Sequence, residues 1–153
     1  MKKLFIIISL LTVLAMCFSG CGKNKTASNS NDSGAQGVVT VDFTKNADGY
    51  YRISAEVAHE MMVSESGYVI LDVREEWEYN EAHITGAVLL PVTQIIEKAD
   101  EILPDKNQKI FVYCRSGNRS LNASADLAAL GYTNVWEFGG IIDWPYDVTT
   151  PNE

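Results

Sequence analysis

Cysteine, histidine and basic residues are all scarce in this chain of 153 residues. There are three cysteines, two histidines, and 12 Lys and Arg against 20 Asp and Glu. The cysteines and histidines do not have metal-site spacing, and no glycine-rich phosphate motif indicates a nucleotide, so we expect neither metal nor cofactor. The formal charge of −8 disfavours binding to nucleic acid or to anionic lipid headgroups.

The chain also lacks a hydrophobic run of about 20 residues, the length that a transmembrane helix requires. Its longest apolar run extends from Leu4 to Phe18 and follows Lys2 and Lys3. A charged start before a short apolar run is typical of an export signal, so residues 1–20 are predicted to be a signal peptide. A retained membrane anchor is the less favoured alternative. Removal of this leader and its two lysines leaves 10 basic and 20 acidic residues, a formal charge of −10.

The end of the apolar run resembles a bacterial lipoprotein signal. Phe18-Ser19-Gly20-Cys21 is similar to the lipobox, in which the signal peptidase cuts before a lipidated cysteine. The resemblance implies that Cys21 becomes a lipid-modified N-terminus. The protein would then be anchored to the cell membrane at its extracytoplasmic face, through this lipid only. The export signal by itself predicts a secreted or periplasmic protein instead.

The rest of the chain divides into a tether and one domain. Residues 21–37 contain no large apolar side chain and consist mainly of Gly, Ser, Asn and Lys, a composition typical of a flexible tether. Residues 38–153 are enough for one compact domain and too few for two of ordinary size.

Short apolar runs alternate with helical stretches in this domain. Strands are predicted at 68–73, 87–90, 109–114 and 134–138, with a weaker strand pattern in Val39, Val41 and Phe43. Helices are predicted at 54–63 with Ser54 as N-cap, at 93–103 ended by Pro104, and at 119–130 ended by Gly131. This alternation indicates an α/β fold, in which a central, mostly parallel sheet has helices on both faces.

Cys114 is the strongest candidate for a catalytic residue. It ends a predicted strand and is followed by Arg115-Ser116-Gly117-Asn118-Arg119, which leads into a helix; ligands of parallel sheets bind at such places. Gly117 and Asn118 tolerate unusual backbone angles, so the loop amides can converge on one point, where the helix dipole adds positive potential. Together with the two arginines, these groups favour the thiolate form of cysteine.

A buried, inert cysteine is the alternative for Cys114. Two neighbouring arginines disfavour it, because their charges would be costly to desolvate beside a buried thiol. Cys17 lies in the leader and Cys21 would carry lipid, so Cys114 is expected to be the only free thiol of the mature protein. Exported proteins normally pair their cysteines, so a lone thiol indicates a chemical role.

The loop from Cys114 to Ser120 resembles the active-site loop of single-domain rhodaneses, which are sulfurtransferases that carry sulfur as a cysteine persulfide. Three further matches follow the same order over about residues 51–148: Leu71-Asp-Val-Arg-Glu75, Glu81-Ala-His-Ile-Thr-Gly-Ala87 and Phe138-Gly-Gly-Ile-Ile-Asp-Trp144. The resemblance implies a single rhodanese-like domain with Cys114 as the catalytic cysteine. It also implies a substrate-binding loop made of Arg115, Ser116, Gly117, Asn118 and Arg119.

The same resemblance implies supporting roles for other residues. Asp72 and Arg74 match positions that hold loops near the site, and we expect Arg74 to pair with Glu81. His83 matches a histidine that is mainly structural, with a catalytic base as the alternative.

We therefore expect a sulfurtransferase that takes sulfane sulfur from a small anionic donor such as thiosulfate. The acceptor must be external, an added thiol, cyanide or a protein, because no second free cysteine is available. One alternative is a catalytically weak binding or redox-sensing module. Another is a cysteine-dependent phosphatase or arsenate reductase, whose Cys and Arg are separated by five residues. Only four separate Cys114 from Arg119, which favours a single sulfur atom over a tetrahedral oxyanion.

Overall fold

A five-stranded parallel sheet forms the centre of the protein in a computed structural model that describes residues 43–150. Every neighbouring pair of its strands is parallel. β3 (His83–Ile84) and β7 (Val148–Thr149) form a separate antiparallel pair. The order in the main sheet is β1 (Tyr51–Arg52), β6 (Val135–Gly140), β5 (Ile110–Cys114), β2 (Val69–Asp72) and β4 (Val88–Leu89).

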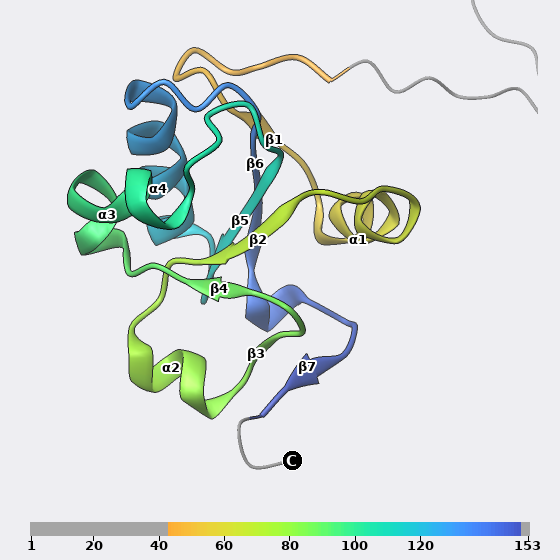
Figure 1. Cartoon of the computed structure of the whole chain (residues 1–153). Coiled ribbons are helices and arrows are strands. Elements are labelled where there is room, and N and C mark those ends of the chain that lie inside the picture. Colours follow the sequence, from red (N-terminus) through yellow and green to blue (C-terminus); the bar gives the residue numbers. More distant parts are fainter. Residues whose placement is uncertain (1–42, 151–153) are drawn as a thin grey trace, which may run out of the picture. The chain divides into compact units, whose positions relative to one another are not determined.

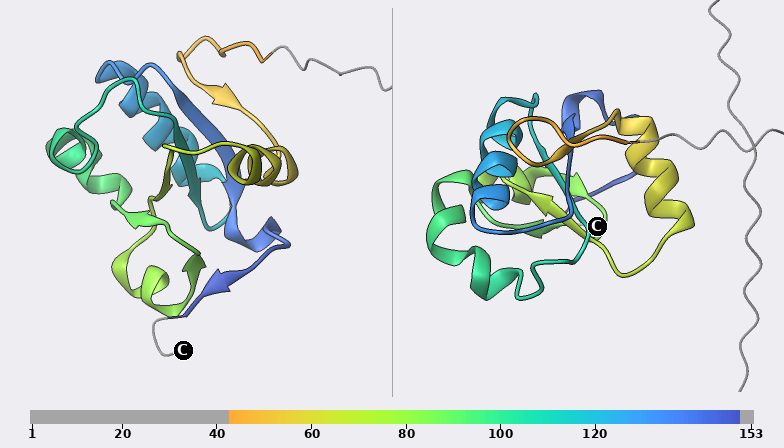
Figure 2. Two further views of the ribbon diagram at one scale, coloured as in Figure 1. Left: turned by 45° about the vertical axis from the view of Figure 1, so that its right-hand side comes forward. Right: turned by 90° about the horizontal axis from the view of Figure 1, so that it is seen from above.

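Helices cover both faces of this sheet, as Figures 1 and 2 show. α1 (Ala55–Ser64) lies on one face, and α3 (Ile95–Ile102) and α4 (Asn118–Ala129) lie on the other. Successive strand residues point to opposite faces, so Phe111 packs with residues of α1, whereas Val112 packs with those of α3 and α4. The predicted α/β fold with a mostly parallel, doubly covered sheet is confirmed.

The longer elements match their predicted positions, and the short strand predicted at 87–90 is β4. The Ser54 hydroxyl caps α1 by accepting the N–H of Val57 at 3.3 Å. The helix predicted at 93–103 is a 3₁₀ turn, η1 (Val92–Gln94), followed by α3. We did not predict β1, α2 (Glu76–Glu81), β3, η2 (Ile141–Asp143) or β7. These elements are too short for a periodic pattern to develop. The strand expected to include Phe43 is wrong at that residue, which lies outside every helix and strand.

Several predictions fall on residues outside 43–150. They are the signal peptide at 1–20, the lipidated Cys21, the tether at 21–37, and the contribution of Val39 and Val41 to a strand. Within residues 43–150, no helix combines the length and the hydrophobicity needed to cross a membrane.

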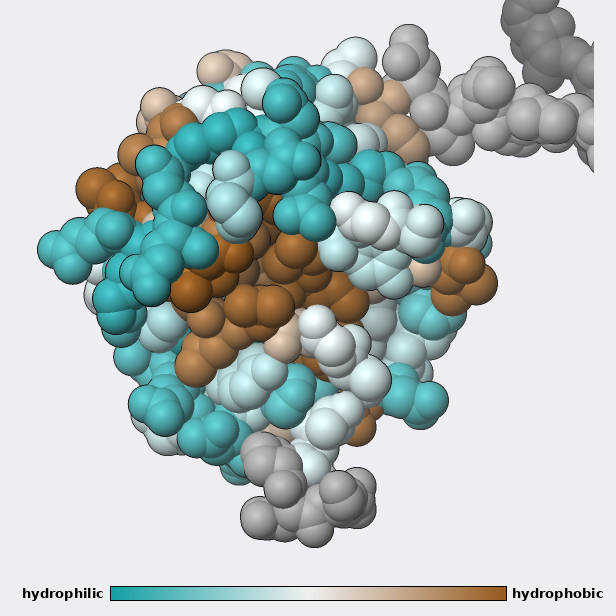
Figure 3. Space-filling view, viewed as in Figure 1, coloured by the Kyte–Doolittle hydropathy of each residue, from teal (hydrophilic) through white to brown (hydrophobic). Residues whose placement is uncertain are grey.

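The face seen in Figure 1 has an apolar area among mostly polar side chains. Figure 3 shows hydrophobic residues gathered near the middle of that face, where β4 lies at the edge of the sheet. Val88 of β4 and Ile102 of α3 are 40% and 39% exposed. β4 contains only two residues, and so short an edge strand offers little backbone for pairing with another chain.

Candidate active site

Cys114 ends the fully buried strand β5 and lies at the base of the loop that enters α4. Cys114 is only 1% exposed. Gly117 has a φ of 98°, a conformation that glycine adopts without strain, and this bend turns the backbone back toward the sulfur. The Gly117 N–H therefore donates to Cys114 Sγ, with 3.1 Å between nitrogen and sulfur. The predicted place of Cys114, between a strand and a helix, is confirmed.

The surroundings of Cys114 favour the thiolate. Burial raises the pKa of the thiol, but several hydrogen bonds act in the opposite direction. The backbone N–H and the hydroxyl of Ser120 contribute most, followed by the N–H groups of Ser116 and Gly117. Together they outweigh the burial and hold the pKa of Cys114 below its ordinary value. The buried Cys114 thiolate is thus stabilised by backbone amides and a hydroxyl at the start of α4 and in its loop.

The loop lies directly on the end of β6, where Gly140 permits a close approach. A Cβ atom added to Gly140 would be 2.2 Å from the carbonyl oxygen of Arg115 and 2.6 Å from Cα of Ser116. Ile142 N–H donates to that same carbonyl at 3.2 Å. Gly140 therefore belongs to the base of the loop, which gives a physical reason for glycine in the Phe138-Gly-Gly stretch.

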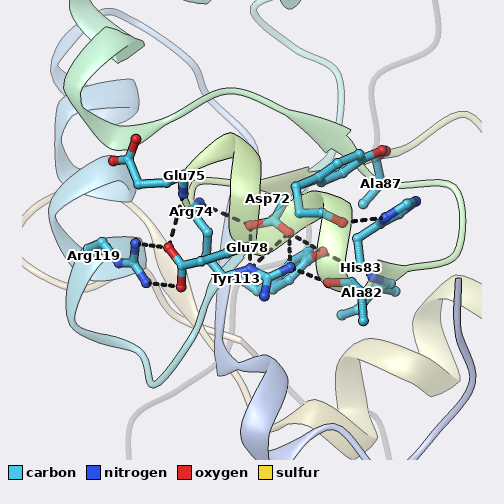
Figure 4. Close-up of polar contacts among 11 residues, drawn as sticks. Asp72, Arg74, Glu75, Glu78, Ala82, His83, Ala87, Tyr113 and Arg119 are labelled. Atoms are coloured by element: carbon cyan, nitrogen blue, oxygen red, sulfur yellow. Dashed lines mark hydrogen bonds and ion pairs between the residues drawn. The ribbon is translucent and has the colours of Figure 1, made fainter. Parts of the chain in front are cut away.

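The two loop arginines have different surroundings. Arg119 forms a bidentate ion pair with Glu78 of α2, at 2.5 and 2.8 Å (Figure 4), and the hydrogen bond to Glu78 raises the pKa of Arg119. Arg115 is exposed and lines a depression of about 340 Å³ together with Trp77 and Ile142, which are 68% and 62% exposed. Arg119 therefore fixes α2 against the loop, and Arg115 is the arginine at the open surface.

The predicted pair between Arg74 and Glu81 is wrong. Arg74 pairs with Asp72 instead, at 2.6 Å between Nη2 and Oδ2, and also donates to the carbonyl of Ala82 (Figure 4). The physical reason is burial: the carboxylate of Asp72 is fully buried and requires a cationic partner, whereas Glu81 is exposed. Tyr113 also donates to Asp72, at 2.7 Å.

Asp72 and Arg74 thus connect three segments. They link the end of β2 to β5 through Tyr113, and to the residues between α2 and β3 through the Ala82 carbonyl. Burial, reinforced by the nearby Asp72 charge, raises the pKa of Tyr113, which keeps its hydroxyl protonated as the donor. This geometry agrees with the loop-holding role that the family resemblance implies.

The contacts of His83 agree with a structural role. Its ring stacks on that of Tyr79 with 3.8 Å between the centroids. Its Nδ1 lies 2.9 Å from the Tyr79 carbonyl oxygen, and the Tyr79 hydroxyl donates to the carbonyl of Ala87. Within residues 43–150, no group of three or more His, Cys, Asp or Glu side chains is placed to hold a metal ion.

Three residues that contact the site were missed from the sequence: Glu78, Ser120 and Glu137. Glu78 is one of several glutamates in an acidic segment, so the sequence did not distinguish it. A possible signal was its spacing from Glu75, whose N–H its carboxylate accepts in a capping box. Ser120 belongs to the resembling loop, but no sequence pattern indicated its partners. Glu137 offered a signal, because it is the one charged residue among the apolar residues at 135–138 of a predicted strand.

The fold and the site define an α/β protein with a reactive-cysteine loop at the carboxyl end of a central strand. The family profile described as "Rhodanese-like domain" matches residues 54–145, more than half of the chain. The chain belongs to this family.

Two curated relatives are similar over different lengths. Thiosulfate sulfurtransferase PspE of Escherichia coli K12 is 37% identical over 73 residues, which cover 48% of this chain and 70% of PspE. The tRNA uridine(34) hydroxylase of Erwinia tasmaniensis is 33% identical over 115 residues, 72% of this chain but only 32% of that enzyme. The shared part is therefore most of the smaller protein and about a third of the larger one.

Solved structures show the same relationship. A rhodanese with anions from E. coli has a TM-score of 0.52 and 32% identity, and the match covers 54% of this chain and 98% of that one. A rhodanese-related protein from Thermoplasma volcanium has a TM-score of 0.56 and 34% identity, covering 64% and 96%. These structures bear out the rhodanese-like fold, and family membership supports sulfurtransferase chemistry in the broad sense.

Proposed function

We propose that the protein moves sulfane sulfur from an anionic donor such as thiosulfate to a thiophilic acceptor, through a persulfide at Cys114. The observation that carries this proposal is the environment of Cys114 Sγ, which is buried beneath loop amides that lower the thiol pKa. The similarity to a thiosulfate sulfurtransferase, and to a rhodanese solved with anions, supports the choice of donor.

The first step forms the persulfide. The Cys114 thiolate attacks the outer sulfur of thiosulfate, the sulfur–sulfur bond of the donor breaks, and its electron pair leaves with sulfite. The new terminal sulfur carries the negative charge, and the loop amides that favour the thiolate can stabilise this charge too. The exposed Arg115 would attract the doubly charged donor to the loop.

The second step passes the sulfur to an acceptor. A cyanide ion or a thiolate attacks the terminal sulfur, the persulfide bond breaks, and its electron pair returns to Cys114 as thiolate. Cys114 is the only cysteine between residues 43 and 150, so the acceptor is taken to be a separate molecule: a small thiol, cyanide or a protein.

The ion pair between Arg119 and Glu78 disfavours the phosphatase alternative. A cysteine-dependent phosphatase needs its loop arginine free to hold the equatorial oxygens of a phosphoryl group. Here that guanidinium donates to both carboxylate oxygens of Glu78. Sulfur transfer requires no such clamp, because the anionic charge that must be stabilised lies on one sulfur atom.

Thiosulfate-to-cyanide transfer tests the proposed activity. The wild-type protein should form thiocyanate. The rate for Cys114→Ser should be at least about a thousandfold lower, because the nucleophile is absent. Comparable rates for the two proteins would contradict the proposal. Persulfide formation without transfer to cyanide or small thiols would favour the redox-sensing or binding alternative.

We further propose that the domain is attached to the extracytoplasmic face of the cell membrane by lipid on Cys21. The support is the leader at 1–20 with its lipobox-like end. Labelled fatty acid should be incorporated by the wild-type chain in a bacterial host, and Cys21→Ser should not be labelled. Incorporation into Cys21→Ser would contradict lipidation there and leave the secreted or periplasmic alternative.

A further inference from the structure

Trp77 and Ile142 are large apolar side chains that remain exposed beside the active-site loop. Trp77 of α2 is 68% exposed and Ile142 of η2 is 62% exposed. Neither belongs to the two hydrophobic core clusters formed by residues 43–150. The core therefore does not depend on them, although a buried tryptophan ring would be favourable. Neighbouring apolar side chains that stay exposed are typical of a surface that binds a ligand.

The two side chains line a groove between α2 and the segment from η2 to β7. Its first part has a volume of about 340 Å³ and is lined by Trp77, Arg115 and Ile142. The second part, about 310 Å³, is lined by Ile142, Tyr146 and Val148. Figure 1 shows α2 and β7 beyond the end of β5 that leads into α4. Pockets for small molecules begin at about 300 Å³, so each part has the size for a small organic molecule.

The groove begins at the residue that is bonded to the nucleophile. Arg115 directly follows Cys114, and Cα atoms of consecutive residues are about 3.8 Å apart. The N–H of Ile142 donates to the Arg115 carbonyl at 3.2 Å, which holds η2 against the loop. A molecule in the first part of the groove therefore lies next to the loop that carries the nucleophile.

The charged residues of the first part leave little net charge for a ligand. Arg74 and Glu78 are each neutralised by an ion pair with a neighbouring side chain (Figure 4). Arg115 and Glu81 are exposed, and no ion pair among residues 43–150 includes either of them. Their opposite charges offset each other. A groove with apolar side chains and no net charge is complementary to a neutral molecule with an apolar body.

We propose that Trp77 and Ile142 are specificity-determining residues for the sulfur acceptor, and that this acceptor is a small neutral thiol with an aromatic or branched aliphatic body. The inference rests on the proposed function in taking an external thiol as acceptor. The apolar body lies against Trp77 and Ile142. The thiol loses its proton to solvent and attacks the terminal sulfur, the persulfide bond breaks, and its electron pair remains on Cys114. Cyanide has no such body and makes neither contact.

Sulfur transfer from the thiosulfate-loaded protein tests the role of Trp77. Benzyl mercaptan and 2-mercaptoethanol are thiols of similar acidity, and only the first carries a ring. Trp77→Ala should lower kcat/KM for benzyl mercaptan about tenfold, through a higher KM, because one aromatic contact is lost. The rates with 2-mercaptoethanol and cyanide should change less than about twofold, and Trp77→Phe should retain most of the preference. An equal loss with all three acceptors, or no loss with benzyl mercaptan, would overturn the proposal.

Ile142 has a matched control in Ile96 of α3. Both isoleucines are 62% exposed, but Ile96 lines neither part of the groove. Ile142→Ala keeps the backbone N–H that binds the loop and should lower kcat/KM for benzyl mercaptan about threefold. Ile96→Ala should leave it unchanged. An equal loss in the two variants would overturn the proposal.

Alkylation of the free Cys114 thiol separates this inference from the proposed function. Iodoacetamide and N-benzyl iodoacetamide react at the same carbon atom and require no sulfur donor. Trp77→Ala should lower the ratio of the second rate to the first about tenfold; an unchanged ratio would overturn the proposal. A lowered ratio in a protein that forms no persulfide would refute the proposed function alone. Transfer to a cysteine-containing peptide but not to benzyl mercaptan would assign the groove to a polypeptide and overturn the proposal.

Discussion

Replacing Gly140 by alanine should disable the active-site loop with only a moderate loss of stability. The new Cβ would lie 2.2 Å from the Arg115 carbonyl oxygen and 2.5 Å from the carbonyl carbon. Non-bonded carbon atoms settle near 3.5–4 Å, so the loop must move by about 1 Å. Such overpacking typically reduces the free energy of unfolding by about 1–3 kcal/mol. The loop amides move with it, and hydrogen bonds to the thiolate are lost.

The consequence for Cys114 can be measured separately from stability. Each lost hydrogen bond to a charged group is worth about 1.5–3 kcal/mol, which corresponds to a rise of about one to two units in the thiol pKa. Iodoacetamide alkylation at neutral pH should therefore slow at least about tenfold, and thiosulfate-to-cyanide transfer should fall with it. Denaturant unfolding gives the stability change.

Gly67→Ala is the matched control for Gly140→Ala. Gly67 has a φ of 77° with no atom near its added Cβ, so alanine there should reduce the free energy of unfolding by about 1–2 kcal/mol through backbone strain. Alkylation of Cys114 should stay at the wild-type rate. The reasoning fails if Gly140→Ala leaves alkylation unchanged, or if both variants slow it equally.

Three further predictions concern the charged groups of the site. The pKa of Cys114 is lowered in the folded protein, so its thiolate adds stability above the ordinary thiol pKa of about 8.5. This contribution is lost as the pH falls through the lowered pKa of Cys114. Between that pKa and the ordinary thiol pKa, the free energy of unfolding of the wild type, measured in urea, should therefore rise with pH relative to that of Cys114→Ser. Asp72→Asn leaves the buried Arg74 unpaired and should reduce the unfolding free energy by about 3–5 kcal/mol, again measured in urea. Glu78→Gln removes the ion pair of Arg119 and should destabilise by about 1–2 kcal/mol, while the freed arginine should lower the KM for thiosulfate.

Two results would contradict these predictions. Glu65→Gln, which breaks the more exposed ion pair with Lys109, should alter the free energy of unfolding by less than about 1 kcal/mol. An equally small change in the free energy of unfolding for Asp72→Asn would show that the buried ion pair between Asp72 and Arg74 does not stabilise the segments it connects. A stability difference between the wild type and Cys114→Ser that falls with rising pH would contradict the lowered thiol pKa.

The sequence predicted four of the five strands of the main sheet, all but β1, because the central strands are continuous apolar runs. The strand predicted at 109–114 is β5. Ser54 is the N-cap of α1, as predicted, and α4 ends at Ala129, two residues before Gly131. α2 and β7 have six and two residues and owe their structure to tertiary contacts. The Arg119 ion pair, for example, joins α2 to the loop, and no local pattern could have predicted either element.

The site was predictable where its chemistry is local in the sequence. Cys114 and its loop form one continuous segment, so strand, turn and helix signals could be combined there. The acidic partners were not predictable, since Arg74 and Arg119 each had several carboxylates within reach and only tertiary packing selects among them. In the folded protein Arg74 pairs with Asp72 and Arg119 pairs with Glu78. The burial of Glu137 likewise depends on tertiary packing.

Intact-mass spectrometry of purified protein after incubation with thiosulfate tests the central claim most directly. The account predicts a gain of one sulfur atom, its removal on addition of cyanide, and no gain in Cys114→Ser. A wild-type protein that gains no sulfur from thiosulfate, or a Cys114→Ser variant that gains it equally, would contradict a persulfide at Cys114.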